Sequence, residues 1–222
     1  MNNPVDVILT CCGRFDLLQR TLHSFFKVNT YPIRKFVVYD DKGLNNYTQF
    51  DWEFVHILQQ QFNKVLWIQK RERVGQILSL DRLMQEVETD YYFNCEEDWL
   101  FLKDGFISES INILEKYPMC NQVQLRGAEN INGHPSVYKD GVLRLTEGYR
   151  GKWNGWGFNP SVRRRSDYEL IGQYSDHTEF SPTIPYQSEI EIANIYHKMG
   201  YFTAVLPNTY ITHIGEKRGI RK

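Results

Sequence analysis

Apolar residues in the first hundred positions alternate between short continuous runs and helical spacing. Residues 5–10 (VDVILT) form a short run with several β-branched side chains, which is typical of a buried parallel strand. Residues 14–27 then place Leu18, Leu22 and Phe25 on one face of a predicted helix. The same alternation predicts further strands at 33–39, 64–69 and 91–94, and further helices at 54–62 and 74–88.

This alternation predicts an α/β fold with a mostly parallel, doubly wound sheet that helices cover on both faces. After residue 100 the pattern becomes mixed. It predicts a helix at 105–117, a strand at 121–126, a hairpin at 136–145, a helix at 188–199 and a strand at 201–206. We expect a single domain over residues 1–222, with a nucleotide-binding half at 1–100 and a mixed half at 101–222.

Composition and charge narrow the classes of function. No window reaches the ~20 apolar residues that a membrane span requires, so none is expected. The formal net charge of −1 gives no overall attraction to nucleic acid, and we expect no such partner. The basic runs 163–165 and 217–222 are interpreted as solvated surface or a frayed tail.

The cysteines indicate a reducing environment. Cys11, Cys12, Cys95 and Cys120 have neither metal-knuckle spacing nor the density of a disulfide framework. Cys11 and Cys12 are adjacent at the end of a predicted buried strand, so we expect reduced thiols. The N-terminus carries no apolar leader. We therefore expect a cytoplasmic protein, or a catalytic domain of something longer.

Polar residues follow all four predicted strands of the first half. Ligands of open α/β sheets bind outside the carboxyl ends of the strands, so these residues are site candidates. They are Thr10, Cys11 and Arg14 after the first strand, Asp40 and Asp41 after the second, Arg73 after the third, and Glu96, Glu97 and Asp98 after the fourth.

The acidic triplet Glu96-Glu97-Asp98 is the strongest of these features. Three successive carboxylates repel one another unless a positive charge neutralises them. A divalent ion such as Mn²⁺ or Mg²⁺ does this and can also bridge the phosphates of a nucleotide. An ordinary solvated acidic turn is the alternative. The chain has no GxxxxGK[ST] loop and no GxGxxG after the first strand, which disfavours the usual phosphate cradles.

The chain resembles GT-A-fold glycosyltransferases of the family 2 type. The resemblance lies in VDVILTCCGRFDLLQRTLHSF, VVYDD, RVGQILSLDRLM and YYFNCEEDW, and continues in GWGFNP, SEIEIANIYHKMGYF and THIG. It implies a Rossmann-like, mostly parallel central sheet with a mixed C-terminal part that binds the acceptor and completes the metal site. It also implies metal-dependent transfer of a sugar from a nucleoside-diphosphate sugar, with UDP favoured, to a glycan or other hydroxyl acceptor.

The resemblance also implies roles for the residues at the strand ends. Thr10, Cys11 and Arg14 would line the base and ribose pocket, and Asp41 or Asp40 would accept from the nucleobase. Arg73 and Gly75 lie where the start of a helix approaches the nucleotide, although the family's usual Asn-x-Gly is Arg73-Val74-Gly75 here.

The resemblance assigns the metal to the acidic triplet. Asp98 would be the main carboxylate ligand and His213 a second protein ligand. Glu96 would lie near the ribose, with Glu97 between Glu96 and Asp98. The triplet is Glu-Glu-Asp rather than a plain DxD, so which carboxylate binds directly stays open.

The resemblance places a general base at Glu189. A sugar hydroxyl is a poor nucleophile, and a positioned carboxylate that accepts its proton accelerates attack by roughly a hundredfold or more. Glu191 lies two residues on and does not share a helix face with Glu189, so only one should point into the site. The alternative is that Glu189, next to Ser188, only favours the helix dipole. A base without a second nucleophile favours an inverting reaction.

The aromatic segment 153–158 is where family members contact the sugars. Aromatic faces suit sugar C–H groups, and glycine lets the backbone approach a ligand, which makes Gly157 a candidate. We expect Trp153 to be partly in the core and Trp156 to face the cleft. His134, His177 and His197 have no partner at ligand spacing and are interpreted as structural or exposed.

Two other functions compete with this one. A nucleotidyltransferase also uses carboxylates and a metal on an α/β sheet, but it usually carries a Gly-rich basic signature after the first strand. Cys11-Cys12-Gly13-Arg14 does not supply that signature. A non-catalytic sugar-binding module would need neither a base nor a metal-bound diphosphate.

Overall fold

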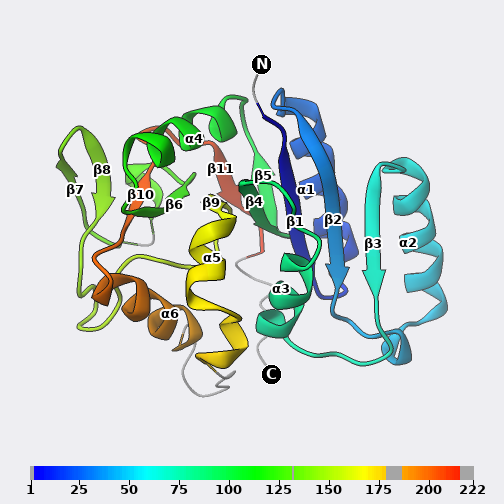
Figure 1. The fold of residues 1–222 in the computed structure, drawn as a ribbon. Coiled ribbons are helices and arrows are strands. Elements are labelled where there is room, and N and C mark those ends of the chain that lie inside the picture. The colour runs from blue at the N-terminus through cyan, green and yellow to red at the C-terminus, as the bar shows by residue number, and fades with distance from the viewer. Residues whose placement is uncertain (1–2, 132, 179–186, 216–222) are drawn as a thin grey trace.

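The computed structural model describes residues 3–131, 133–178 and 187–215. Within these residues the main feature is a nine-stranded sheet in the order β3-β2-β1-β4-β9-β6-β10-β8-β7 (Figure 1). Its strands are β1 (Val5–Cys11), β2 (Ile33–Asp40), β3 (Val65–Gln69), β4 (Tyr91–Glu96), β6 (Cys120–Gln124), β7 (Ser136–Lys139), β8 (Val142–Leu145), β9 (Ser161–Arg164) and β10 (Phe202–Val205). A small second sheet pairs β5 (Trp99–Phe101) with β11 (Ile211–His213).

Helices connect and cover the strands. They are α1 (Phe15–Val28), α2 (Gln49–Gln61), α3 (Gln76–Met84), α4 (Phe106–Lys116), α5 (Arg165–Ile171) and α6 (Gln187–Lys198), with 3-10 turns η1 (Leu44–Asn46), η2 (Ala128–Asn130) and η3 (Tyr174–Asp176). Strands β1 to β4 pair in parallel, with β1 between β2 and β4. The predicted α/β class with a mostly parallel sheet is therefore confirmed.

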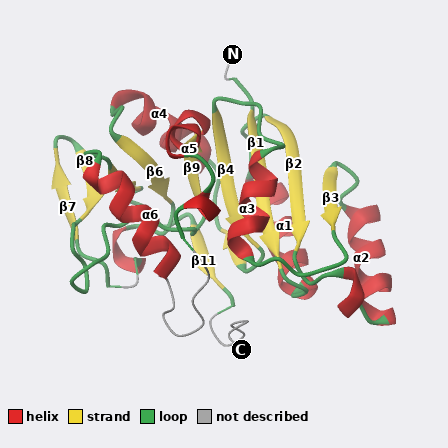
Figure 2. Ribbon diagram, turned by 60° about the horizontal axis from the view of Figure 1, so that its bottom comes forward, coloured by secondary structure: helices red, strands yellow, loops and turns green. Residues whose placement is uncertain are grey.

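Two hydrophobic layers hold the sheet, one on each face. Alternate residues of β1 enter different layers, because successive side chains of a strand point to opposite faces. Val7 and Leu9 pack with α1, α2 and α4, whereas Ile8 packs with α3 and α6. Figures 1 and 2 show α1 on one side of the sheet and α3 and α6 on the other. Burying each large apolar side chain stabilises this arrangement by roughly 1.5–3 kcal/mol.

Two local predictions can be compared with the structure, one for a hairpin and one for the start of a helix. The hairpin at 136–145 is confirmed: β7 and β8 pair antiparallel, and Asp140 and Gly141 have φ of 52° and 82° at the turn. Helix α2 begins before the predicted residue 54, because Thr48 and Asp51 form a reciprocal capping box at its N-terminus.

Strand β9 was not predicted, and its arginines were misinterpreted. β9 runs antiparallel between β4 and β6, in the middle of the sheet. Arg163 is 2% exposed, so the interpretation of run 163–165 as solvated surface is wrong for this residue. Arg163 tolerates burial because its guanidinium donates to Gly157 O, Ser161 Oγ and Tyr174 OH. The basic run 217–222 lies outside the described residues.

The small β5–β11 sheet was also absent from the prediction. It pairs Trp99 with His213 and Ile211 with Phe101. The amide of Ile214 extends the pairing by donating to Asp98 O at 2.9 Å. This sheet carries a late segment of the chain to the end of β4, where the acidic triplet lies.

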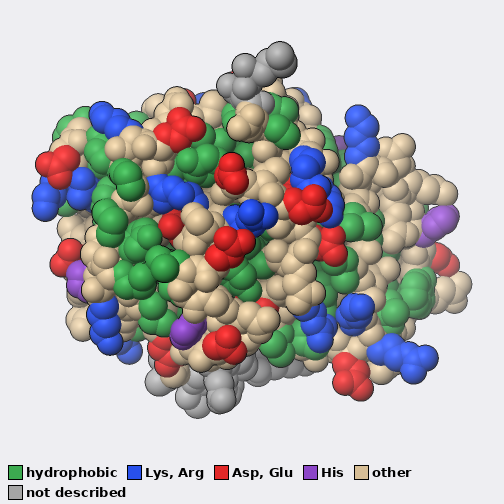
Figure 3. Space-filling model, in the orientation of Figure 1, with side chains coloured by type: hydrophobic (Ala, Val, Ile, Leu, Met, Phe, Trp, Pro, Cys, Tyr) green, Lys and Arg blue, Asp and Glu red, His purple; other side chains and the backbone are tan. Residues whose placement is uncertain are grey.

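Surface charge and helix length are relevant to nucleic-acid and membrane partners. On the face shown in Figure 3, basic and acidic side chains are interspersed, so this face presents no extended surface of one charge. Among the described residues, no helix combines the length and apolar content needed to cross a membrane.

Candidate functional site

The parallel register brings the ends of three strands together. Thr10 in β1 pairs with Glu96 in β4, and Cys11 pairs with Asp40 in β2. β1, β2 and β3 point the same way in Figure 1, so their carboxyl ends lie along one edge. This edge is where an open α/β sheet binds its ligands.

Asp98 is a buried carboxylate at this edge that contacts two basic side chains. It is 5% exposed, and its Oδ2 lies 3.2 Å from His213 Nε2 and 2.8 Å from Arg14 Nη1. Burial raises the pKa of Asp98, but the hydrogen bonds and charges of His213 and Arg14 outweigh it, so the pKa lies below its ordinary value. Asp98 is therefore ionised at neutral pH.

Gly215 packs its backbone directly against this carboxylate. A Cβ at position 215 would lie 2.1 Å from Asp98 Oδ2, a distance that no side chain tolerates. The last residue of the THIG segment is thus a glycine because the chain must approach Asp98 closely.

Glu97 shares Arg14 with Asp98 and also contacts the end of β1. Its Oε1 accepts from Arg14 Nε at 2.8 Å and from the amide of Cys12 at 3.2 Å. Its backbone carbonyl accepts from Thr21 Oγ1 at 2.6 Å. Arg14, which the resemblance assigns to the base and ribose pocket, lies between the carboxylates of Glu97 and Asp98. Within this structure it neutralises part of the acidic triplet.

Glu96 is the partly exposed member of the triplet. It accepts from Gln76 Nε2 at 2.8 Å and from Trp99 Nε1 at 3.3 Å. Burial by its neighbours raises the pKa of Glu96 to about 8, and the negative charges of Asp98, Glu97 and Glu189 add to this effect. The carboxyl groups of Asp98, Glu97 and Glu189 therefore lie close enough to Glu96 to affect its ionisation.

The donor atoms present fit a hard divalent cation. Two ligands at right angles on an ion with bonds of about 2.1 Å lie about 3 Å apart, which is close to the 3.2 Å between Asp98 Oδ2 and His213 Nε2. Carboxylate oxygen suits Mn²⁺ and Mg²⁺, and the imidazole nitrogen is the commonest protein ligand of metals. The His, Cys, Asp and Glu side chains of the described residues form no group of three around one point. Asp98 and His213 thus supply two donor atoms that could hold such an ion only together with further oxygen ligands.

Both carboxylates after β2 already accept hydrogen bonds from the protein. Asp41 accepts from the amides of Val74 and Gly75 at 2.7 and 2.8 Å, and Arg73 Nε lies 3.7 Å away. Asp40 accepts from the amide of Lys42 at 3.0 Å and from the Tyr47 hydroxyl. Asp41 therefore anchors the start of α3, whereas Asp40 is turned into the protein.

The first loop exposes a residue that the resemblance did not point to. Thr10 and Cys11 are buried in β1, whereas Cys12 is partly exposed and its Sγ lies 3.6 Å from Asp41 O. Across from it, no atom lies within 4 Å of the position a Cβ would take at Gly75. The backbone at this strand end is thus open beside Gly75, whose amide donates to Asp41.

Glu189 sits at the first turn of α6 and is 8% exposed. Its Oε1 accepts from the amide of Phe158 at 2.7 Å. Burial raises the pKa of Glu189 to about 7, although the Phe158 amide and the charge of Arg163 act in the opposite direction. Glu191 instead accepts from Gln187 Nε2 at 2.7 Å and from the Thr178 hydroxyl. The two glutamates thus face different surroundings.

Gly157 makes room for Glu189 rather than exposing backbone to solvent. A Cβ at position 157 would lie 2.7 Å from Glu189 Oε1 and 3.5 Å from Trp153 Cζ2. The approach that the glycine permits is therefore that of the Glu189 carboxylate and the Trp153 ring.

The prediction that Trp156 faces the cleft is wrong. Trp156 is 1% exposed, and its ring packs against Phe158, Tyr174 and Tyr196. The partly exposed indole is that of Trp153, whose Nε1 donates to Trp156 O at 2.7 Å. Both residues are aromatic, and only the packing of α6 against the sheet decides which one enters the core.

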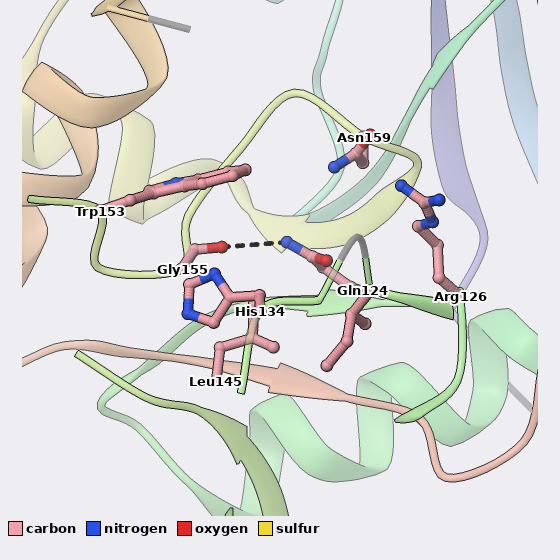
Figure 4. A pocket seen from close by; sticks show the side chains of 8 residues that line it. Gln124, Arg126, His134, Leu145, Trp153, Gly155 and Asn159 are labelled. Atoms are coloured by element: carbon pink, nitrogen blue, oxygen red, sulfur yellow. Dashed lines mark hydrogen bonds between the residues drawn. The ribbon is translucent and has the colours of Figure 1, made fainter. Parts of the chain in front are cut away.

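A small cavity lies beside Trp153 (Figure 4). Its walls are Gln124, Arg126, Ile131, His134, Leu145, Trp153, Gly155 and Asn159. Its volume of about 10 Å³ is room for about one water molecule and not for a sugar ring. His134 is buried here, and its Nε2 lies 2.7 Å from Thr146 O, in keeping with its interpretation as structural.

Solved structures of two glycosyltransferases share this fold. The structure of mannosyltransferase PcManGT from Pyrobaculum calidifontis in complex with GDP-Man and Mn²⁺ matches 99% of this chain, with a TM-score of 0.66 and 14% identity. The structure of GalNAc-T7 with UDP, GalNAc and Mn²⁺ matches 94%, with a TM-score of 0.66 and 12% identity. This chain spans 59% and 43% of the lengths of those two chains.

No protein-family model and no curated protein matches the sequence. The likeness therefore lies in the three-dimensional arrangement, which covers nearly the whole chain. The mostly parallel sheet and the two neighbours agree with the fold that the sequence resemblance implies. This chain has the GT-A fold of glycosyltransferases.

Proposed function

We propose that this chain transfers a sugar from a nucleoside-diphosphate sugar, preferably a UDP-sugar, to a hydroxyl group of a glycan or other acceptor, with inversion at the anomeric carbon. The main support is the meeting of three features at one edge of the sheet. These are the Asp98–His213 pair, the surrounding carboxylates, and the buried Glu189 that acts on Glu96.

Asp98 and His213 would hold Mn²⁺ or Mg²⁺, with the donor diphosphate and water completing the coordination. The bound ion would neutralise the negative charge that develops on the diphosphate as it leaves. Both structural neighbours were solved with Mn²⁺, one with GDP-Man and the other with UDP. Arg14, at 2.8 Å from both Glu97 and Asp98, would keep these carboxylates ionised and in place.

Glu189 would be the base. Its pKa of about 7 lets it be ionised near neutral pH and still accept a proton as the hydroxyl attacks. The acceptor oxygen forms a bond to the anomeric carbon, the bond from that carbon to the phosphate oxygen breaks, and the hydroxyl proton passes to Glu189. Because this is one displacement, the configuration inverts.

The site can also be compared with the two alternative functions, a sugar-binding module and a nucleotidyltransferase. A carboxylate whose pKa is raised by burial destabilises the folded protein when ionised, so a sugar-binding module would have no use for it. A nucleotidyltransferase would share the metal site. The two functions differ in their products, because a nucleotidyltransferase would release pyrophosphate rather than a nucleoside diphosphate.

A melting-temperature screen tests the proposal. Each of UDP-, GDP- and dTDP-sugars is added with and without Mn²⁺, because a ligand of the folded state raises the melting temperature by mass action. We expect the largest rise in melting temperature with a UDP-sugar, and only when Mn²⁺ is present. We also expect the protein to release UDP slowly from that donor. If no nucleotide sugar raises the melting temperature under either condition, the proposed function is wrong.

A further inference from the structure

Residues 155–158 have irregular backbone that is buried beside the sheet. Such backbone needs hydrogen-bond partners, because an unsatisfied buried amide or carbonyl is destabilising by roughly 1–3 kcal/mol. Side chains supply them: Gln124 to Gly155 O at 3.0 Å, Trp153 to Trp156 O at 2.7 Å, Gly157 N to Gln122 at 3.5 Å, Arg163 to Gly157 O at 2.5 Å, and Asn94 to Phe158 O at 2.7 Å.

We call the side chains that hold residues 155–158 the cradle. The cradle explains why the central strands carry buried polar residues. Asn94 lies in β4, Gln122 and Gln124 in β6, and Arg163 in β9, and all four are nearly inaccessible to solvent. Within the segment, the amide of Phe158 is the group directed to Glu189, at 2.7 Å from its Oε1. The cradle therefore fixes the position of the one amide that holds the proposed base.

Arg163 differs from the other members because it carries a charge. Its partners among the described residues are uncharged: Gly157 O, Ser161 Oγ at 2.9 Å and Tyr174 OH at 3.5 Å, with the Trp156 ring 4.7 Å from the guanidinium carbon. A buried cation without an ion-pair partner is costly to desolvate, and an apolar side chain would fill the same space without that penalty. A role for the charge itself is therefore needed.

We propose that Arg163 is a positioning residue for Glu189: its guanidinium holds the Gly157–Phe158 peptide that donates to Glu189 and supplies positive charge that favours the ionised carboxylate. This inference rests on the proposed function insofar as Glu189 is the base. Through the peptide, Arg163 acts on the base without touching the reacting atoms.

Among the residues that the structure describes, few charged groups act on Glu189. Arg163 in β9 lowers the pKa of Glu189, whereas its acidic neighbour Glu96 in β4 has a pKa of about 8 and is largely protonated at neutral pH. The phenols of Tyr174 and Tyr92 surround Arg163; burial lowers the pKa of its guanidinium, and these groups more than offset that effect. Without Arg163, the effect of burial would be opposed only by the Phe158 amide, so the pKa of Glu189 would rise above about 7.

The test is a carboxyl NMR titration of the full chain carrying ¹³C-labelled glutamate, with the Glu189 signal assigned by its loss in Glu189→Gln. We expect a midpoint near 7 in the parent. In Arg163→Gln it should rise by about one pH unit or more. Arg144→Gln is the control, because Arg144 is a partly buried cation that lies over the Phe202 ring at 3.7 Å, in β8. Its midpoint should be parental.

Transfer kinetics give a second measurement. The kcat of Arg163→Gln should fall about tenfold or more, with its acid limb moved to higher pH, while Mn²⁺-dependent nucleotide binding is unchanged. Arg163→Lys keeps the charge but not the planar fork, so its midpoint should stay near the parental one while kcat falls. If circular dichroism shows that Arg163→Gln does not fold, Arg163→Lys decides the matter.

A parental Glu189 midpoint in folded Arg163→Gln, or a parental kcat in Arg163→Lys, would overturn the proposal. The NMR titration needs no turnover, so it separates this inference from the proposed function. A parent that transfers no sugar but shows the Arg163-dependent midpoint would refute the function and keep the Arg163–Glu189 link.

Discussion

The imidazole Nε2 of His213 lies 3.2 Å from Oδ2 of Asp98. The two residues come from distant parts of the chain and meet because β11 pairs with β5, with His213 opposite Trp99. The indole and imidazole rings lie 4.7 Å apart, which holds the imidazole beside the carboxylate. The metal site that we propose is therefore built on a rigid strand pairing rather than on a free loop.

Replacing Asp98 by Asn should remove metal-dependent nucleotide binding. The amide keeps the size of the side chain but loses the charge that a divalent ion requires, and the interaction with Arg14 weakens as well. We expect the affinity for UDP in the presence of Mn²⁺ to fall roughly a hundredfold, as measured by calorimetry. Asp140→Asn, at an exposed hairpin turn, is the control and should bind like the parent. Unchanged affinity in Asp98→Asn would remove Asp98 from the metal site.

Replacing Glu189 by Gln should lower transfer and raise stability together. The amide oxygen can still accept from Phe158, but it cannot take the proton of the acceptor, so kcat should fall roughly a hundredfold or more with donor binding intact. A carboxyl with a folded pKa of about 7 and an ordinary value of 4.5 destabilises the protein when ionised, by an amount on the order of 3 kcal/mol at pH 8.

The sign of this stability difference gives a direct check. The folded protein binds the Glu189 proton more tightly than the unfolded chain, so the parent gains stability as the pH falls from about 7 toward 4.5. Urea unfolding should thus show Glu189→Gln more stable than the parent at pH 8 and equal to it near pH 4.5. Glu191→Gln serves as the control for both kcat and stability. Near-normal turnover of Glu189→Gln would move the base elsewhere.

The pH dependence of kcat should have an acid limb at about 7. Glu189 is active when ionised, so kcat should fall about tenfold per pH unit below this value and level off above it. Steady-state rates from pH 5.5 to 8.5 at saturating donor and acceptor test this expectation. An acid limb near 4.5, the value of an unperturbed glutamate, would mean that the base is not buried during turnover.

Replacing Gly157 by Ala should displace the proposed base with little effect on folding. The added Cβ would lie 2.7 Å from Glu189 Oε1, and the end of that side chain can move aside. We expect kcat to fall about tenfold or more because the carboxylate loses its position, with nucleotide affinity and melting temperature close to those of the parent.

Gly151→Ala is the matched control for this prediction. Gly151 has a positive φ of 79° and open space where its Cβ would lie, so alanine there strains the backbone without touching the site. It should reduce stability and leave kcat unchanged. A parental kcat in Gly157→Ala would show that Glu189 tolerates the displacement or is not the base.

Local patterns were enough to predict strands β1 to β4 of the sheet. Apolar runs such as 5–10, helical spacing such as 14–27 and the Asp140-Gly141 turn depend on contacts between near neighbours in the chain. The acidic triplet was also visible, because it directly follows a strand. The Thr48–Asp51 capping box carried the signal for the start of α2, although the prediction began that helix later.

Only the tertiary structure decided how these pieces combine into a site. β5, β9 and β11 have three or four residues each, too few for a periodic pattern, and they form because the chain returns to the sheet. Their pairing buries Arg163, sets His213 against Asp98 and leaves Arg14 between Glu97 and Asp98. Likewise, the packing of α6 buries Trp156 and turns Glu189 toward Phe158. Residue type and spacing define which groups are present, whereas burial and charge environment, which set their chemistry, arise from neighbours that are distant in sequence.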